Sequence, residues 1–187
     1  MRNRLKHCSL FCTLASALYL AASQPTAVPD QPRAVPEMAR LAEHLVGSWD
    51  TTEIMERSDL FPNGGSRHGR VQAKLAAGGT TLIYEVHTDG SAGKLNGLLV
   101  IWWEKDSGLY RFFICFNNPK HPCLMRGTGH WDGDVFMNDY EEVIDGKSEP
   151  WRDSFTFTPT THTLVAARRK NDSTWETLIT THSLRRR

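Results

Sequence analysis

The sequence lacks the short motifs that mark several large enzyme classes. It contains no Gly-x-Ser-x-Gly, no His-Glu-x-x-His, no Cys-x-x-Cys and no phosphate-binding glycine loop that opens a helix. Its eight histidines are scattered, without a His-x-His spacing on one strand. These absences argue against hydrolases with a nucleophile elbow, zinc peptidases and nucleotide-binding enzymes of the glycine-loop type. We expect no metal and no catalytic residue of these classes.

Charge of one sign is also missing. The 187 residues include 22 Lys and Arg against 21 Asp and Glu, which gives a formal net charge of +1. Such a balance creates no overall field that attracts nucleic acid, and we expect no nucleic-acid partner. With 40% hydrophobic and 23% charged residues, the composition is that of an ordinary globular protein with room for one domain.

Only one long apolar run occurs, at residues 8–20, and it is short for a membrane span. Basic residues precede it and Ala21-Ala22-Ser23 follows, so residues 1–23 are predicted to be a signal peptide. The alternative is an uncleaved anchor helix. The signal peptide predicts a protein exported to the periplasm or secreted, with no membrane span after its removal.

Four prolines fall within residues 24–36, which favours an extended linker. We expect the folded domain to cover residues 37–184 and residues 185–187 to form a basic tail.

The domain is predicted to be all-β. After a short helix over residues 38–46, apolar and polar residues alternate, and turn signals recur every 8 to 12 residues. About ten strands are expected, starting near residues 47, 69, 80, 95, 109, 123, 134, 149, 162 and 175. Because so many antiparallel strands must protect their edges, the pattern favours a single up-and-down β-barrel with a short N-terminal helix.

Three early hairpins agree on which side of the sheet is apolar. Centring them on their turn residues pairs Ala73 with Leu82, Tyr84 with Leu99, and Ile101 with Phe112. The shared apolar face then consists of Val71, Ala73, Leu75, Leu82, Tyr84, Val86, Leu99, Ile101, Trp103, Tyr110, Phe112 and Ile114.

Several short motifs resemble those of lipocalins and related calycin barrels. Gly47-Ser48-Trp49 after a short helix resembles the Gly-x-Trp opening of that family, and Arg168 resembles the basic residue that packs over its tryptophan. Residues 127–134 are similar to bacterial lipocalin-like domains of unknown function. Ten strands are more similar to fatty-acid-binding and nitrobindin-like barrels. The resemblance covers residues 38–183 and implies a barrel that holds a small molecule.

Two cysteines remain after signal removal, Cys115 and Cys123. A hairpin centred on Pro119 places them opposite one another, which predicts a disulfide in an oxidising compartment. The alternative is a pair of buried thiols on opposite faces, because a slip of one residue reverses a strand.

Extending the same register pairs Phe112 with Arg126, Asp139 with Asp153, and Phe155 with Leu164. This pairing places five charged residues inside the later half of the barrel. They are Arg126, His130, Asp139, Asp153 and Arg168. Interior arginines suggest a cavity in which guanidinium groups meet an acidic or polar head group. Alternatively, Arg126 and Asp139 neutralise one another, or a slipped register turns both outward.

The remaining predicted ligand-binding residues are mostly aromatic. Tyr84, Trp103, Phe112 and Phe155 are expected to hold the apolar body of the ligand, and Trp49 and Glu53 share the inward parity. Nitrobindin-like barrels ligate haem through a late histidine. However, their Gly-x-Trp-x-Gly-x-Gly opening is missing here, so we expect no cofactor and give His182 or His130 only a subordinate haem hypothesis.

Three functions stay open at this point. The leading one is an exported barrel that binds a small amphipathic molecule. The second is a calycin-like enzyme with Asp139, Asp153 or Glu53 as acid or base. The third is a filled barrel that acts through outward apolar residues, for example by forming a homodimer, unless the N-terminal helix covers them. These residues are Trp102, Phe113, Met125, Trp131 and Phe136.

Overall fold

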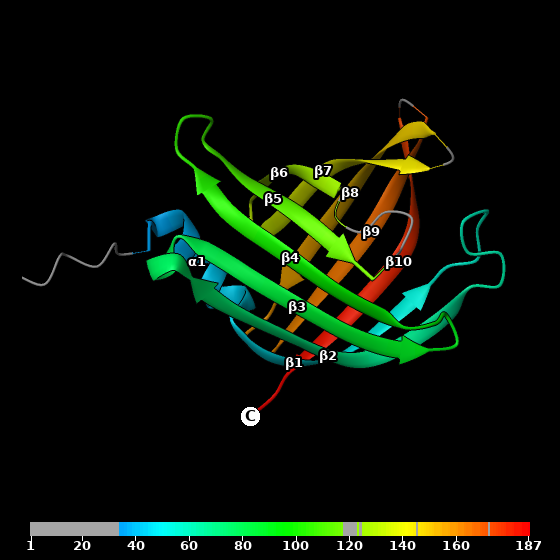
Figure 1. Ribbon diagram of the computed structural model, residues 1–187, viewed down its shortest axis with the longest axis horizontal. Helices are drawn as coiled ribbons and strands as arrows, with labels where there is room; N and C mark the ends of the chain where they lie inside the picture. Colours follow the sequence, from blue (N-terminus) through cyan, green and yellow to red (C-terminus); the bar gives the residue numbers. More distant parts are fainter. Residues whose placement is uncertain (1–33, 118–122, 124, 145, 172) are drawn as a thin grey trace, which may run out of the picture. The chain divides into compact units, whose positions relative to one another are not determined.

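A computed structural model describes residues 34–117, 123, 125–144, 146–171 and 173–187 (Figure 1). The predicted signal peptide and most of the predicted linker therefore lie outside the described residues. The elements are the helix α1 (Pro36–Leu45), the short 3-10 turn η1 (Ala77–Gly79) and ten strands. The strands are β1 (Gly47–Met55), β2 (Gly65–Ala76), β3 (Thr81–Gly90), β4 (Leu95–Glu104), β5 (Leu109–Phe116), β6 (Met125–Asp132), β7 (Val135–Ile144), β8 (Lys147–Phe157), β9 (Thr161–Asn171) and β10 (Thr174–Arg185).

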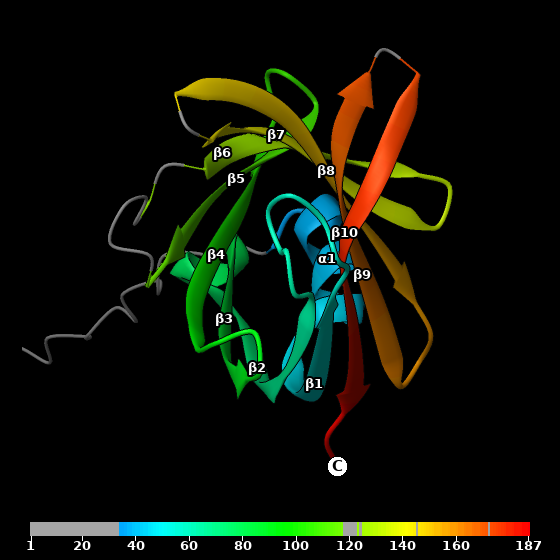
Figure 2. The same ribbon diagram turned by 90° about the vertical axis from the view of Figure 1, so that its right-hand side faces the viewer.

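The ten strands form one closed antiparallel barrel. Each strand pairs with its neighbours in sequence, and β1 pairs with β10 to close the ring. Figure 2 looks into this ring, with α1 at the far end. The up-and-down barrel predicted from the alternation is confirmed. Closure gives every strand of the described barrel a neighbour on both sides, so the barrel has no edge strand.

Helix α1 closes one end of the barrel with its apolar side. Met38, Leu41 and Leu45 are fully buried and belong to the same core cluster as the first-strand tryptophan, Trp49. The indole N–H of Trp49 donates to the Leu45 carbonyl oxygen at 2.9 Å. This contact fixes the helix on the first strand.

The basic residue over Trp49 is Arg185, which corrects the assignment of Arg168 to that position. The Arg185 guanidinium lies 4.2 Å from the Trp49 ring centroid and donates to the carbonyl oxygens of Val46 and His44 at 2.7 and 3.2 Å. A cation at a helix C-terminus satisfies carbonyls that lack intrahelical partners. Arg185 thus belongs to β10 rather than to a free tail.

The predicted register is confirmed for three strand pairs: β3 with β4, β4 with β5, and β8 with β9. Tyr84 pairs with Leu99, Ile101 with Phe112, and the β8–β9 ladder places Leu164 opposite Phe155. The first hairpin differs by two residues, because Ala73 lies opposite Tyr84 instead of Leu82. A shift of two preserves the face of every side chain.

The predicted pairing of β5 with β6 is wrong by one residue. Arg126 lies opposite Phe113 and not opposite Phe112. The inner and outer faces of β6 and β7 are therefore exchanged relative to the prediction. The predicted interior residues Arg126, His130 and Asp139 therefore lie on the outer face. The predicted outer residues Met125, Trp131 and Phe136 lie on the inner face, where Phe136 is fully buried and the other two pack on or within the core cluster.

Two inward glycines explain this reversal. A Cβ at Gly127 would meet the Asp139 carbonyl oxygen and the Phe112 ring, and a Cβ at Gly129 would meet the ring of Phe136. Strand β6 therefore has no side chain at these two inward positions, and the neighbouring aromatic rings fill the space. Those two positions consequently carry no apolar signal in the sequence.

A second slip of one residue, between β7 and β8, cancels the first. Asp153 pairs with Asn138 rather than with the predicted Asp139. Strand β8 thereby returns to the predicted orientation, with Asp153 and Phe155 facing inward and almost completely buried.

Cys115 and Cys123 form the predicted disulfide, with their Cα atoms 4.0 Å apart. The β5–β6 ladder nevertheless ends at Ile114 and Met125, one residue away from the register in which the cysteines would be direct partners.

Among the described residues, no helix combines the length and the hydropathy needed to cross a membrane.

Candidate functional site

The half of the barrel next to α1 is filled with side chains. Tyr110 packs edge-on against Phe136 and Trp103, with ring centroids 5.0 and 4.9 Å apart. Phe112 is almost fully buried above them. This packed region is the floor of the barrel. Of the predicted ligand-binding residues, Trp49, Trp103 and Phe112 belong to the floor.

Beyond the floor, the barrel holds a cavity of about 380 Å³. Phe61, Lys94 and Asn117 line it from the connections after β1, β3 and β5, so it opens at the end opposite α1, which we call the mouth. Its walls are largely apolar and include Val71, Leu99, Ile114, Met125, Phe155, Leu164, Ala166 and Ile179. The volume lies in the range of small-molecule pockets.

One buried carboxylate in the cavity wall is fully engaged by protein groups. Glu53 on β1 is 6% exposed, as its parity with Trp49 predicted. Its Oε2 lies 2.7 Å from Nε of Arg67 on β2 and accepts a 2.9 Å hydrogen bond from the Thr88 hydroxyl on β3. The ion pair compensates the burial of both charges.

A second buried carboxylate, Asp153 on β8, has a different environment. It is 6% exposed, and its Oδ1 accepts a 3.1 Å hydrogen bond from the Tyr140 hydroxyl on β7. Burial raises the pKa of Asp153 to about 7; the charges of Glu142 and Asp139 add to this rise, while the Tyr140 hydrogen bond opposes it. Asp153 thus changes charge near neutral pH.

Aromatic rings line the cavity beside Asp153. Trp151, two residues before it on the same strand, is 4% exposed, and its indole N–H has no hydrogen-bond partner among the described residues. The Tyr140 ring stacks on Trp151 with centroids 6.3 Å apart and planes 20° apart.

Across the barrel, burial raises the pKa of Tyr84, whose hydroxyl shares a 3.2 Å hydrogen bond with Nε2 of His162. The pKa of His162 falls to about 4 because of burial and the Arg185 charge.

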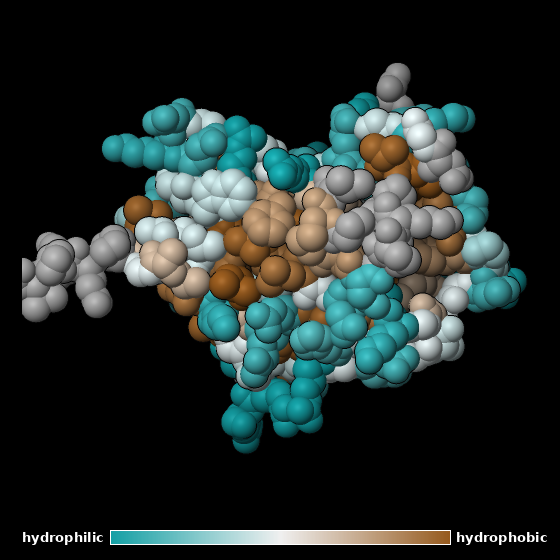
Figure 3. Space-filling view, viewed as in Figure 1, coloured by the Kyte–Doolittle hydropathy of each residue, from teal (hydrophilic) through white to brown (hydrophobic). Residues whose placement is uncertain are grey.

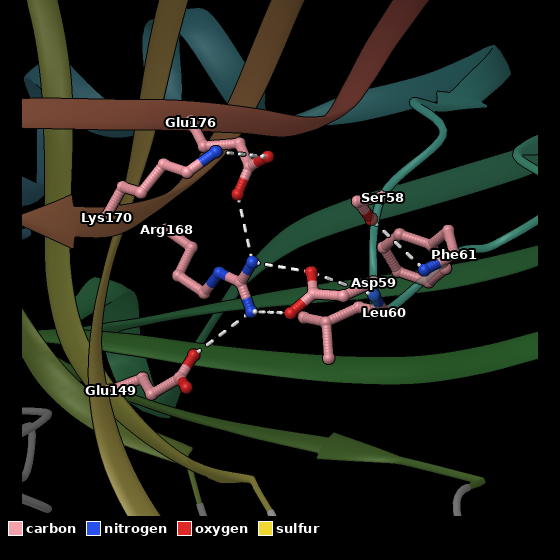
Figure 4. Close-up of polar contacts among 8 residues, drawn as sticks. All are labelled: Ser58, Asp59, Leu60, Phe61, Glu149, Arg168, Lys170 and Glu176. Carbon is pink, nitrogen blue, oxygen red and sulfur yellow. Dashed lines mark hydrogen bonds and ion pairs between the residues drawn. The ribbon is translucent and has the colours of Figure 1, made fainter.

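An arginine at the mouth ties the β1–β2 connection to strands β8, β9 and β10 (Figure 4). Arg168 on β9 is 9% exposed and makes a two-pronged pair with Asp59, at 2.6 and 3.1 Å. The same guanidinium reaches Glu176 on β10 at 2.9 Å and Glu149 on β8 at 3.3 Å. The connection that carries Asp59 also places Phe61 on the cavity. Arg168 therefore holds one wall of the mouth in place.

The predicted site residues fall into four groups: the cavity, the floor, the mouth and the outer face. Glu53, Tyr84, Asp153 and Phe155 line the cavity. Three lie in the floor and Arg168 lies at the mouth, as described above. On the outer face, Asp139 accepts a 2.6 Å hydrogen bond from Arg152 and lies 3.8 Å from Nδ1 of His130. The inferred interior pair of Arg126 and Asp139 does not exist.

Sequence reasoning missed Tyr140, Trp151 and Arg67 as cavity residues. Trp151 shares the parity of Asp153 and Phe155, a signal that was present in the sequence. Arg67 and Tyr140 depend on pairings between strands that the sequence did not fix. His182, the subordinate haem candidate, shares a 3.2 Å hydrogen bond with Thr163 on the outer face.

The outer face keeps only part of the predicted aromatic patch. Trp102 and Phe113 lie outward with ring centroids 6.4 Å apart, next to Val100 and Ile83 on neighbouring strands. Figure 3 shows an apolar area in the middle of this face with polar side chains around it.

No group of three or more His, Cys, Asp or Glu side chains suited to a metal ion occurs in the part of the chain that the structure describes.

Comparison with known proteins supports the fold alone. No protein-family model and no curated protein matches this chain. Among solved structures, the chain is similar to the crystal structure of Rv2717c from M. tuberculosis, with a TM-score of 0.50 and 14% sequence identity. The match covers 82% of this chain and 99% of that one.

Proposed function

We propose that this protein binds a small, mostly apolar molecule inside its barrel. The observation that carries the proposal is the cavity of about 380 Å³, which stays open although the other half of the barrel is densely packed. Well-packed interiors contain few voids larger than a water molecule. A cavity of this size with apolar walls and a few convergent polar groups is typical of ligand sites.

Two further features fit this proposal. The Gly47-Ser48-Trp49 opening resembles lipocalin-like barrels, a class that holds ligands inside the barrel. The disulfide between Cys115 and Cys123 is compatible with an oxidising compartment, and so with the export that the N-terminal sequence predicts. We propose that the protein meets its ligand outside the cytoplasm.

The pKa of Asp153 near 7 favours a second function, acid–base catalysis in the same cavity. Acid–base catalysis commonly pairs a proton donor with a proton acceptor in the same cavity. Glu53, the other deeply buried carboxylate of the cavity, is held by Arg67 and Thr88. Binding without reaction is therefore the better supported function.

A fluorescence titration of the full chain with the neutral probe N-phenyl-1-naphthylamine tests binding. Ala166 is buried and lines the cavity, whereas Ala167 faces outward on the same strand. Ala166→Phe fills part of the cavity and should abolish the fluorescence increase. Ala167→Phe adds the same side chain outside and should leave it intact. Absence of binding by the wild type, or unchanged binding by folded Ala166→Phe, would contradict the proposal.

A further inference from the structure

We propose that the ligand is an organic cation: an apolar body carrying a protonated amine or quaternary ammonium group, which sits beside Asp153 against Tyr140 and Trp151. This inference rests on the proposed binding function and adds the charge of the ligand. It reverses the expectation of an acidic head group that the sequence suggested.

The charges that line the cavity favour a cation. Three carboxylates, Glu53, Glu142 and Asp153, face two basic side chains, Arg67 and Lys94. Arg67 lies 2.7 Å from Glu53, and Lys94 is exposed to solvent in the connection between β3 and β4. Because Arg67 balances Glu53, ionised Asp153 adds a negative charge to the cavity wall.

Asp153 itself lacks the partner that Glu53 has. Buried carboxylates are normally compensated by a cation or by several hydrogen-bond donors. Glu53 has both an arginine and a hydroxyl, whereas Asp153 has only the Tyr140 hydroxyl among the described residues. An ammonium group in the cavity would supply the missing cation. The hydrogen bond that it donates would be charge-assisted at both ends.

The aromatic surroundings of Asp153 suit the same group. Tyr140 and Trp151 are direct cross-strand partners with stacked rings, and both line the cavity. The face of an indole or phenol ring attracts cations through its quadrupole, most strongly where water is excluded. The carboxylate and the rings together provide a charge partner and a polarised wall for an alkylammonium head.

Among the described residues that line the cavity, no guanidinium is available to an anionic ligand. Arg126, the predicted interior arginine, lies on the outer face. Arg168 is engaged by three carboxylates at the mouth, and Arg67 by Glu53. A carboxylate head group would instead meet the charge of Asp153.

Displacement of N-phenyl-1-naphthylamine by three ligands of equal chain length tests the charge preference. We expect n-octylammonium to displace the probe at lower concentration than n-octanol, and n-octanoate to be weakest, at pH 8. Asp153→Asn should weaken n-octylammonium about 10- to 100-fold, as loss of a charge-assisted hydrogen bond does, and change n-octanol little. Asp134→Asn removes the same charge from an exposed turn and should change neither.

The outcomes separate the two proposals. Equal displacement by the three ligands, or an unchanged preference in Asp153→Asn, would overturn the cationic ligand while the bound neutral probe still supports a cavity. Failure of the probe to bind the wild type would overturn the binding function and the cation with it.

Discussion

Replacing Asp153 with asparagine should stabilise the protein at alkaline pH. Burial raises the pKa of this carboxyl from its usual value of 3.8 to about 7. Each pKa unit corresponds to about 1.4 kcal/mol, so ionising Asp153 costs the folded state about 4 kcal/mol above pH 7. Asparagine resembles the protonated carboxyl and carries no such penalty.

Proton linkage determines in which direction pH changes the free energy of unfolding. Because the folded-state pKa is raised, the unfolded chain releases this proton first as pH rises. Asp153 therefore lowers the free energy of unfolding progressively between about pH 4 and pH 7, and the loss is complete above that range. At pH 4 both forms carry a neutral group, and the variant should match the wild type within about 1 kcal/mol.

Urea unfolding of the wild type, Asp153→Asn and the exposed control Asp134→Asn at pH 4 and pH 8 measures this difference. The variant's advantage should grow from near zero at pH 4 to about 4 kcal/mol at pH 8, with no growth in the control. An advantage that does not depend on pH would refute the reasoning. The loss of n-octylammonium binding in the same variant would show that the carboxylate is kept for binding at the expense of stability.

Three further predictions concern other parts of the barrel. The pKa of His162 is lowered to about 4, so protonation of this residue should lower the free energy of unfolding by about 3 kcal/mol between pH 7 and pH 4. In urea unfolding at the two pH values, His162→Gln should lack this part of the pH dependence. Asp59→Asn should release the β1–β2 connection from Arg168 and accelerate dissociation of N-phenyl-1-naphthylamine in stopped-flow fluorescence; an unchanged rate would show that the connection does not control access. Gly127→Ala should lower the free energy of unfolding by about 1 to 3 kcal/mol, because the added Cβ meets the backbone of β7; a neutral result would argue against the inward orientation of this glycine.

The early strands were predictable because every inward position carries an apolar side chain. Leu82, Leu99, Ile101 and Phe112 alternate with polar or half-buried neighbours, and their hairpin turns agree on the same face. A register error of two residues, as in the first hairpin, leaves such a face unchanged. Strand number, barrel closure and the inner face of β2 to β5 could therefore be predicted from local pattern.

Strand β6 was placed with the wrong face inward, because glycines occupy two of its inward positions, 127 and 129, and weaken its apolar pattern. The prediction relied instead on pairing Cys115 directly with Cys123. The disulfide forms, but it lies outside the ladder and does not set the register. Met125 and Trp131, which share the parity of the glycines, carried the correct signal.

Asp153 was correctly predicted to face inward, although the predicted pairings of β5 with β6 and of β7 with β8 were both wrong. Two opposite slips of one residue restored the orientation of β8. The contact between Asp59 and Arg168 is separated by 109 residues and has no local sequence signal. It depends on how the β1–β2 connection lies across the mouth, which the sequence pattern does not determine.

The pKa of the Asp153 carboxyl, followed by carbon-detected NMR with and without saturating n-octylammonium, tests the account most directly. The account predicts a midpoint near pH 7 in the free protein. With the cation bound, linkage requires the midpoint to fall by about one to two pH units, matching the 10- to 100-fold effect expected for Asp153→Asn. A midpoint that stays in place, or rises, when n-octylammonium is bound would contradict a cation beside Asp153.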